Sequence, residues 1–375
     1  MSLDVRVIES PASAEVYITA SPSPGAPAAR QAAEVFADIR NALTAAHARI
    51  LEERVFATER SLETIRPIRA RAYGELDDGV PPTQLVVPAG GMGELAGVQV
   101  HAVRCDRAPE PLRLGESVCG RRIKLGQSSY VAVSGLSAPE AGMAAAQARK
   151  MFEKAESVLR QVGADMHSVA RTWVWLDDIL SWYDEFNGVR NRFFVEHGLL
   201  NGSTRTGHPP ASTGIGVSLA GRPRCGLDLV AICGEPGCVR HYSRAGHQNP
   251  PYQYGSAFSR ASKAATPAGG TVFVSGTAAI DDRGITQHVG DVAAQIEATI
   301  GHVRAVLQEM SCTDADVVQA IAYSKTVEAE KAFRARQRNL SWPCLSVIAD
   351  VCRHELLFEI EATACPGARA IASIA

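Results

Sequence analysis

The sequence has no excess of positive charge. Its 38 Lys and Arg residues are matched by 40 Asp and Glu residues, for a formal net charge of -2, and no segment is rich in Lys or Arg. Binding to nucleic acid needs a concentrated positive surface that meets the phosphates. We therefore expect no nucleic-acid partner.

Long apolar segments and an even set of cysteines are also missing. No stretch reaches the roughly 18 uninterrupted apolar residues of a membrane-spanning helix. The first six residues show neither the basic start nor the apolar block of a signal peptide. The nine cysteines are scattered and odd in number, which favours reduced thiols over a disulfide framework. We expect a cytoplasmic protein that does not contact membranes.

What is present is ample material for a folded core. The chain has 375 residues, of which 46% are hydrophobic and 21% are charged, and these are ordinary values for soluble globular proteins. The length corresponds to about two average domains.

From about residue 120 the chain carries an internal repeat. The segment 130–135 (YVAVSG) recurs at 271–276 (TVFVSG), an offset of 141 residues between Ser134 and Ser275. In both copies a long helical pattern, a β-rich run, a second helical pattern and a final strand then follow in the same order. These segments are 141–162, 170–176, 182–196 and 227–230 in the first copy, and 289–310, 318–323, 328–338 and 358–361 in the second. Agreement in the order of five elements indicates duplication.

The repeat predicts an α+β fold with two ββαβαβ halves in tandem, each with its helices on one face of a sheet. We place an N-terminal region at residues 1–235, ending in a degenerate first half, and a C-terminal domain carrying the active site at residues 236–375. The segment 233–253, rich in Gly, Pro and polar residues, joins the two.

Residues 1 to about 115 are interpreted as an N-terminal extension packed on the first half. The apolar spacing from Ala28 to about Arg54 predicts one amphipathic helix. Segments 83–87 and 98–103 alternate like strands. No motif in residues 1–80 indicates a role for them.

Motifs for cofactors and metals are incomplete. Residues 91–96 (GMGELA) match the letters of a dinucleotide fingerprint, but a strand pattern follows instead of the helix whose N-terminus would hold a pyrophosphate. Cys233, Cys238, His241 and His247 have the chemistry of zinc ligands at a spacing unlike that of structural zinc sites. No Gly-x-Ser-x-Gly elbow is present. We therefore predict neither a cofactor nor a metal.

Four aromatic residues in the first half, Trp173, Trp175, Trp182 and Tyr183, lie at strand and helix spacing. Because aromatic side chains dominate the packing of cores, we expect these residues in the core rather than in a platform that stacks on a ligand.

The final strand carries two carboxylates on one side. Glu359 and Glu361 are two residues apart and so project to the same face, while Phe358 and Ile360 take the other. Two neighbouring carboxylates discourage each other's ionisation, and burial adds to the effect. One of them would then stay protonated near neutral pH, as a general acid must. The pattern fits equally well two solvated carboxylates on an exposed face.

Three segments are dense in polar groups that a purely structural role does not explain. Residues 205–216 (RTGHPPASTGIG) and 252–261 (YQYGSAFSRA) gather guanidinium, hydroxyl and phenol groups, and residues 350–353 (DVCR) precede the final strand. These segments are the candidates for a binding site.

Both halves resemble the YjgF/Rid/UK114 fold, through the Val-x-Val-Ser-Gly pattern near the start and the acid-apolar-acid pattern of the last strand. That family consists of trimeric imine deaminases in which an Arg about fifteen residues before the last-strand Glu binds the substrate carboxylate. Here position 344 is Cys, and residues 210–213 of the first half contain no Arg. The resemblance thus implies the fold without the imine deaminase activity.

The chain is more closely similar to the chorismatase family, in which a degenerate YjgF-like half precedes a complete one. The resemblance covers most of the chain. It rests on segments 91–95 (GMGEL), 208–216 (HPPASTGIG), 254–261 (YGSAFSRA), 352–353 (CR) and 359–361 (EIE). These motifs are specific in combination.

This resemblance implies cofactor-free cleavage of the enolpyruvyl ether of chorismate, with release of pyruvate. Glu359 stands at the position of the catalytic acid that protonates the methylene carbon of the enol ether. Each of the two substrate carboxylates needs a guanidinium, and Arg205 and Arg260 are the candidates for this bidentate pairing. Thr213 and Tyr254 would add further hydrogen bonds.

At positions 352 and 276 the chain has Cys and Gly, and in this it resembles the aromatising branch of that family, which forms 3-hydroxybenzoate. By this resemblance Cys352, seven residues before Glu359, steers the aromatisation, and Gly276 leaves room for the ring to reposition; a plain strand-end turn also explains this glycine.

The alternatives are a hydrolytic chorismatase that forms a dihydroxycyclohexadiene carboxylate, a mixed 3-/4-hydroxybenzoate synthase, and a non-catalytic protein that binds a small carboxylate. We expect a monomer or a homotrimer.

Overall fold

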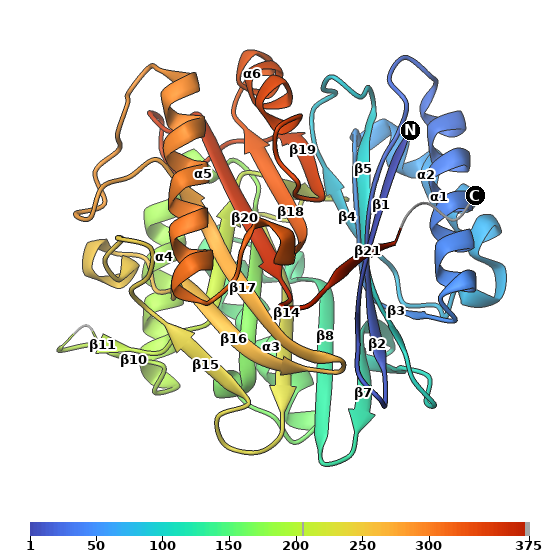
Figure 1. The fold of residues 1–375 in the computed structure, drawn as a ribbon. Helices are drawn as coiled ribbons and strands as arrows, with labels where there is room; N and C mark the ends of the chain where they lie inside the picture. The colour runs from blue at the N-terminus through green and yellow to red at the C-terminus, as the bar shows by residue number, and fades with distance from the viewer. Residues whose placement is uncertain (205, 372–375) are drawn as a thin grey trace.

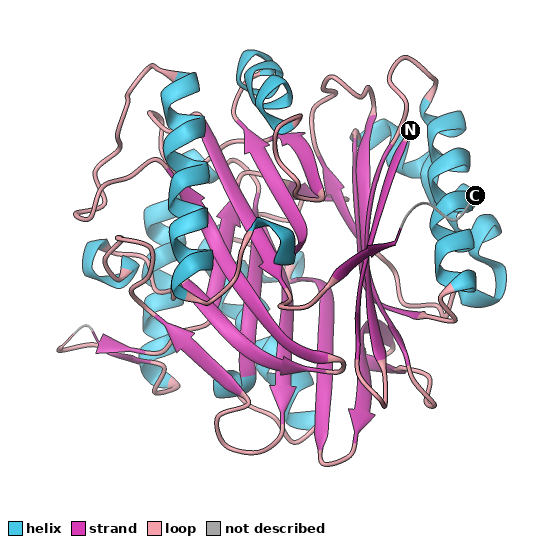
Figure 2. Ribbon diagram, in the orientation of Figure 1, coloured by secondary structure: helices cyan, strands magenta, loops and turns pink. Residues whose placement is uncertain are grey.

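Three β-sheets surround a common centre, and each is covered by helices on its outer face (Figures 1 and 2). The computed structural model describes residues 1–204 and 206–371. Each sheet belongs to a unit that contains the strand and helix order ββαβαββ, and in two of the three units an edge strand precedes it. We call these the N-terminal, middle and C-terminal units, in chain order.

The C-terminal unit has the predicted elements in the predicted order, with one further strand between the second helix and the final strand. Its sheet runs β15-β16-β17-β20-β18-β19, and β18 and β19 are its parallel pair. The elements are β15 (Val239–Tyr242), β16 (Ala261–Thr266), β17 (Gly269–Ala278), α5 (Val292–Glu309), β18 (Val317–Ser324), α6 (Val327–Gln337), β19 (Cys344–Ile348) and β20 (Phe358–Ala364). The predicted linker therefore contributes the edge strand β15 to this sheet.

The middle unit repeats this topology. Its sheet runs β12-β9-β14-β8-β7-β6, with β9 and β12 as the parallel pair. The elements are β6 (Glu110–Leu114), β7 (Ser117–Leu125), β8 (Ser128–Ser137), α3 (Ala144–Gln161), β9 (Val169–Leu176), α4 (Ile179–Glu196), β12 (Ala211–Ile215) and β14 (Cys225–Cys233). The predicted α+β architecture with two tandem halves is confirmed.

The N-terminal extension has the same topology again. Its sheet runs β13-β4-β3-β5-β2-β1-β21, with β3 and β4 as a parallel pair. The elements of the unit are β1 (Ser2–Glu9), β2 (Ala14–Ser21), α1 (Ala28–Ala45), β3 (Arg49–Ala57), α2 (Glu59–Tyr73), β4 (Thr83–Val86) and β5 (Leu95–Arg104). The edge strand β13 (Ser218–Leu219) lies between β12 and β14 of the middle unit, and the edge strand β21 (Arg369–Ile371) follows the C-terminal unit. Both pair with this sheet and so tie the other two units to it.

The helix predicted from Ala28 to about Arg54 was too long. Helix α1 ends at Ala45, and the chain turns at His47, which has a φ of 51°. In β3 only the first of nine residues is exposed, because both faces of the strand are covered. Without the usual alternation of buried and exposed residues, the apolar spacing of this segment was compatible with a helix.

Short elements complete the fold. They are the hairpin of β10 (Leu200–Asn201) and β11 (Thr206–Gly207), and the 3-10 turns η1 (Gly74–Leu76), η2 (Pro139–Ala141), η3 (Met166–Ser168), η4 (Pro251–Tyr254) and η5 (Asp314–Asp316). None of the helices within the described residues is long and apolar enough to cross a bilayer.

Each unit has a core between its sheet and its helices, and a further core joins the inner faces of the three sheets. The central core draws Phe56, Trp175 and Tyr323 from the three different units. Trp173 and Trp182 are buried as expected. Tyr183 is half-buried: it packs against the core of the middle unit, where it stacks on Phe186, and it also lines a cavity.

The seam between the middle and C-terminal units is formed by β12 lying beside β17. The N–H of Ser212 donates to Ser275 Oγ at 2.8 Å, and that hydroxyl donates to the Ser259 carbonyl at 2.6 Å. Ser275 is fully buried, so one hydroxyl satisfies two backbone groups from opposite sides of the seam.

We expect Ser275→Ala to lower the melting temperature by several degrees. The Ser212 N–H and the Ser259 carbonyl would lose a partner, at a cost of about 1–3 kcal/mol in the free energy of unfolding. Calorimetry measures this change. Ser134→Ala is the matched control, since Ser134 stands at the same point of the middle unit and its hydroxyl makes no hydrogen bond within the described residues. An equal drop in melting temperature in both variants would show that the Ser275 hydroxyl does not stabilise the seam through its two hydrogen bonds.

Candidate active site

A cavity opens at this seam, between β12 and α4 on one side and β17 and β20 on the other. It measures about 60 Å³, room for several waters where about 10–15 Å³ holds one. Five of the predicted site residues line it: Tyr254, Arg260, Gly276, Cys352 and Glu359.

Thr213 lies directly behind the cavity wall. Its Oγ1 accepts hydrogen bonds from the Gly276 N–H at 3.0 Å and from Arg171 Nη2 at 2.5 Å. In this structure Thr213 therefore fixes the seam and orients Arg171. The remaining predicted residue, Arg205, lies outside the described residues.

Glu359 extends from β20 into the cavity. It pairs with Ala278 on β17 and with Tyr323 on β18, and it is 5% exposed. A Cβ atom at position 276 would lie 2.1 Å from Glu359 Oε1. The glycine thus makes room for the acid itself, which the sequence did not indicate.

The surroundings keep the Glu359 carboxyl neutral. Burial, reinforced by the nearby charge of Glu361, raises its pKa to about 8, against the opposing effect of Arg171, Arg260 and Arg353. No hydrogen bond reaches its oxygens from any residue that the structure describes. At neutral pH this group is a protonated acid facing a cavity.

Glu361 is equally buried but fully engaged. Its Oε2 accepts from Arg171 Nη2 at 2.9 Å, and its Oε1 accepts from Trp173 Nε1 at 2.6 Å. Both carboxylates of the final strand therefore point inward, which excludes the alternative of two solvated groups, and they differ sharply in their partners.

Cys352 precedes β20 and lines the same cavity. Burial, together with the nearby Glu359, raises the pKa of its thiol to about 12. The group is therefore a neutral thiol at physiological pH, without the thiolate character of a nucleophile.

Three guanidinium groups line the cavity, and two of them were not predicted. Arg260 donates from Nε and Nη2 to the Asn249 carbonyl at 3.1 and 3.0 Å, and Nη2 also donates to the Tyr254 hydroxyl. Arg353 donates to the Gly284 carbonyl. Arg190 on α4 donates to Asn187 Oδ1 at 2.6 Å, while its buried Nε has no partner within the described residues.

Arg190 carried a signal that the sequence analysis overlooked. It follows Phe186 by four residues and precedes Phe193 by three, so all three share one face of α4. A guanidinium on the apolar face of a helix is rarely buried without a function or a charge partner. Arg353 belongs to a segment already noted as polar but had been given no role.

Two phenols complete the polar lining. Burial raises the pKa of Tyr254, and it raises that of Tyr183 to about 12. Both hydroxyls are therefore neutral hydrogen-bond donors. Tyr183 comes from α4 and Tyr254 from η4, so the cavity draws on the middle unit, the C-terminal unit and the segment that connects them.

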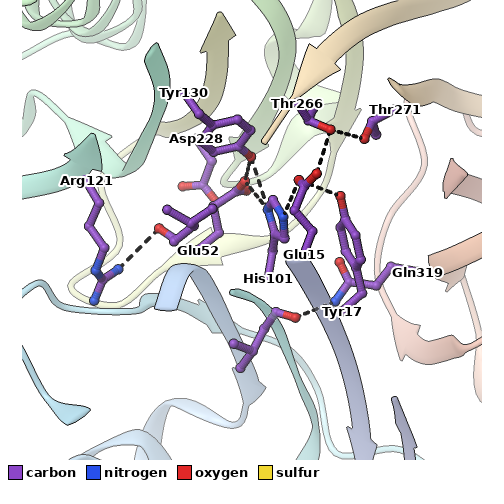
Figure 3. A network of polar contacts seen from close by, with 12 residues as sticks. Glu15, Tyr17, Glu52, His101, Arg121, Tyr130, Asp228, Thr266, Thr271 and Gln319 are labelled. Atoms are coloured by element: carbon purple, nitrogen blue, oxygen red, sulfur yellow. Dashed lines mark hydrogen bonds and ion pairs between the residues drawn. The ribbon is translucent and has the colours of Figure 1, made fainter. Parts of the chain in front are cut away.

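Behind Glu361 lies a buried polar network that joins the three units (Figure 3). His101 Nε2 lies 2.9 Å from Glu15 Oε1, and the Tyr130 hydroxyl donates to Glu52 Oε1 at 2.5 Å. Thr266 Oγ1 donates to Glu15 Oε2 at 2.8 Å. These contacts link strands from the N-terminal, middle and C-terminal units.

Charges in this network are mutually satisfied. Although burial lowers the pKa of His101, its contacts with Glu15 and Glu52 raise it to about 9. Burial likewise raises the pKa of Glu52, but His101 and Arg54 lower it to about 2. We interpret the network as structural, since each ionised group has an opposite charge beside it.

No group of three or more His, Cys, Asp or Glu side chains in residues 1–204 and 206–371 is arranged to hold a metal ion. The cavity instead combines an uncharged acid, three guanidinium groups and two phenols around apolar walls. Such a site is suited to a small organic anion that receives a proton.

Comparison with known proteins agrees with this architecture. The endoribonuclease L-PSP family model matches residues 125–233 and 255–365, which fall on the middle and C-terminal units. Curated protein sequences include no match. A solved chorismatase shares the fold, with a TM-score of 0.62 at 19% identity over 97% of this chain and 100% of that chain.

Smaller solved proteins match single portions of the chain. A member of the YjgF/YER057c/UK114 family from Mycobacterium tuberculosis is 21% identical over 34% of this chain and 98% of its own, with a TM-score of 0.27. The YjgF gene product of E. coli is 20% identical over 34% of this chain and 96% of its own, with a TM-score of 0.24. The two family-model matches together span more than half of the 375 residues. The protein therefore belongs to the endoribonuclease L-PSP (YjgF/Rid) family.

Proposed function

We propose that this protein cleaves the enolpyruvyl ether of chorismate to 3-hydroxybenzoate and pyruvate. The observation that carries the proposal is a protonated carboxylic acid, Glu359, buried in an arginine-lined cavity. The whole-chain similarity in fold to a solved chorismatase adds support. The balance of atoms needs no water and no redox cofactor, because chorismate is an isomer of the two products combined.

Recognition of a dianion rests on the guanidinium groups. Arg190, Arg260 and Arg353 all line the cavity, and guanidinium groups pair with carboxylates through two parallel hydrogen bonds. Arg260 and Tyr254 bond to each other. Since chorismate is far larger than the free volume, these side chains must exchange their mutual contact for contacts with the substrate.

The reaction begins with a proton transfer to carbon. The proton of Glu359 moves to the methylene carbon of the enol ether, whose π electrons form the new C–H bond and leave an oxocarbenium ion. The neighbouring ring hydroxyl oxygen then displaces the ether oxygen, and the C–O bond pair leaves with pyruvate. That oxygen now bridges two ring carbons, and its proton passes to the Glu359 carboxylate. Its original C–O bond then breaks, the ring carbon that keeps the oxygen loses its hydrogen as a proton, the oxygen gains a proton, and the ring becomes the aromatic phenol.

Cys352 is proposed to direct the second step. A neutral thiol is a small apolar group, and beside Glu359 it leaves little room for a water that would attack the cation. Exclusion of water favours the internal hydroxyl as the nucleophile and so favours 3-hydroxybenzoate over a diol.

Product analysis tests the proposal directly. Incubation of the protein with chorismate should yield pyruvate and 3-hydroxybenzoate in equal amounts, separated by liquid chromatography. A cyclohexadiene diol as the main product would indicate the hydrolytic chorismatase instead, and a mixture with 4-hydroxybenzoate would indicate the mixed synthase. Binding of chorismate without any pyruvate would leave only a carboxylate-binding protein.

Glu359→Gln should lower kcat at least about 100-fold, the usual range for loss of a general acid, while the dissociation constant for chorismate changes little. The amide is neutral like the protonated acid it replaces. In the unaltered protein, kcat/KM should be constant below the Glu359 pKa of about 8 and fall as the pH rises through it. Glu355→Gln, at an exposed position in the preceding loop, is the control. Retention of most activity in Glu359→Gln would remove this residue from the mechanism.

Cys352→Ala should raise the share of diol in the product, because the smaller side chain admits a water next to the cation. The ratio of diol to 3-hydroxybenzoate, measured by chromatography, reports this partition without depending on the overall rate. Cys105→Ala, outside the cavity, is the matched control. An unaltered ratio would show that Cys352 does not steer the second step.

A further inference from the structure

The seam between the N-terminal and middle units repeats the geometry of the active-site seam. Gly135 stands at the position of Gly276 in the repeat, 141 residues earlier. Thr83 on β4 faces Gly135, with its Oγ1 3.9 Å from where a Cβ atom would lie, just as Thr213 on β12 faces Gly276. β4 and β12 each follow the second helix of their unit and lie parallel to the strand between its two helices.

Among the described residues, no carboxylic acid at this second seam takes the place that Glu359 has at the first. Gly226 pairs with Ser137 as Glu359 pairs with Ala278, so glycine replaces the acid. A Cβ atom at Gly226 would lie 2.1 Å from Leu219 Cδ1, and Leu219 therefore fills the space of the missing side chain.

The remaining carboxylate at this seam is fully engaged. Asp228 Oδ1 accepts from Thr83 Oγ1 at 2.8 Å and from the Gly135 N–H at 2.7 Å, and Oδ2 accepts from Arg54 Nε at 2.9 Å. Both oxygens of Asp228 are therefore occupied by contacts within the protein.

A cavity of about 950 Å³ nevertheless opens at this second seam. We call it the second cavity. It lies between α2 and β4 of the N-terminal unit and β8 and α3 of the middle unit. By the same measure it is many times larger than the active-site cavity, and it falls within the range of small-molecule sites.

The lining of the second cavity includes cations that no buried carboxylate neutralises. Arg69 is neutralised by Glu53 at 2.6 Å and Asp77 at 3.2 Å. Arg66, in contrast, donates only to the uncharged Gln84 Oε1, at 3.0 Å, among the described residues. Lys154 contacts Glu140, which is 59% exposed, and such exposed ion pairs contribute little.

Apolar groups supply the rest of the walls. They include Val80, Pro81, Pro82, Val118 and Leu136. Arg66 comes from α2 and Lys154 from α3, so a ligand held by both cations would bridge two units. Arg66 has no charge partner among the described residues and Lys154 has only the exposed Glu140. Together with the aliphatic walls, these two cations select an organic anion with an apolar body.

We propose that the second cavity is a non-catalytic binding site for an apolar carboxylate, held by Arg66 and Lys154. The site is independent of the proposed chorismate chemistry, because the two cavities share no lining residue.

The probes are 2-naphthoate and its neutral isostere 2-naphthamide, with affinities measured by isothermal titration calorimetry on the full chain. We expect naphthoate to bind at least about tenfold more tightly than the amide, since a hydrogen bond to a charged group contributes more than one between neutral groups. The double variant Arg66→Gln/Lys154→Gln should weaken naphthoate binding by about the same factor. A crystal grown with naphthoate would place the ligand.

Matched variants make the test specific. Arg71→Gln/Lys150→Gln removes the same charges from exposed positions on the same two helices and should leave the affinity unchanged. Arg260→Gln should also leave it unchanged. Absence of saturable binding at millimolar naphthoate, an equal loss in the matched double variant, or loss of binding in Arg260→Gln would each overturn the proposal.

Discussion

One buried guanidinium binds only one of the two buried carboxylates at the base of the active-site cavity. Arg171 bonds to Glu361 and to Thr213, and Trp173 takes the second oxygen of Glu361. Glu359 is left without a comparable partner. An isolated carboxylate is costly to bury, so the free energy favours its protonated form. If Arg171 reached Glu359 instead, the group would be a permanently ionised, inert half of an ion pair.

The three units show how a repeated scaffold acquires different roles at its seams. The strand that follows the second helix of one unit lies beside the strand that precedes the first helix of the next, at both β12/β17 and β4/β8. A glutamate occupies the first seam, while Gly226 with Leu219 occupies the equivalent place in the second. At the remaining seam Leu345 packs against Gly97, where no side chain would fit. Topology therefore supplies equivalent positions, and single residues decide what each can do.

Much of the middle and C-terminal units was predictable because their local patterns are strong. Residue spacing within a short segment is enough to reveal the repeat of Ser134-Gly135 as Ser275-Gly276, the alternation of acidic and apolar residues in β20, and the amphipathic helices. The N-terminal unit was not recognised as a third copy. Its central strand β3 is covered on both faces and buries charged residues, so it lacks the alternation by which a strand is read.

The residues of the candidate site likewise fall into those that the sequence indicated and those that only the structure revealed. Glu359, Cys352 and Arg260 stand in segments whose composition already marked them, and the structure brings them to one cavity. Arg190 and Tyr183 sit on a helix whose pattern indicates core packing, and their place beside the cavity depends on how α4 meets the C-terminal unit.

The sequence by itself determined the two-half architecture and the presence of paired carboxylates on the last strand, because both depend on residue spacing within one element. Only the tertiary structure decided which carboxylate would be neutral. That choice depends on where Arg171, from a different unit, directs its hydrogen bonds, and on how completely the seam between the units excludes water. Both are long-range properties that no local pattern contains.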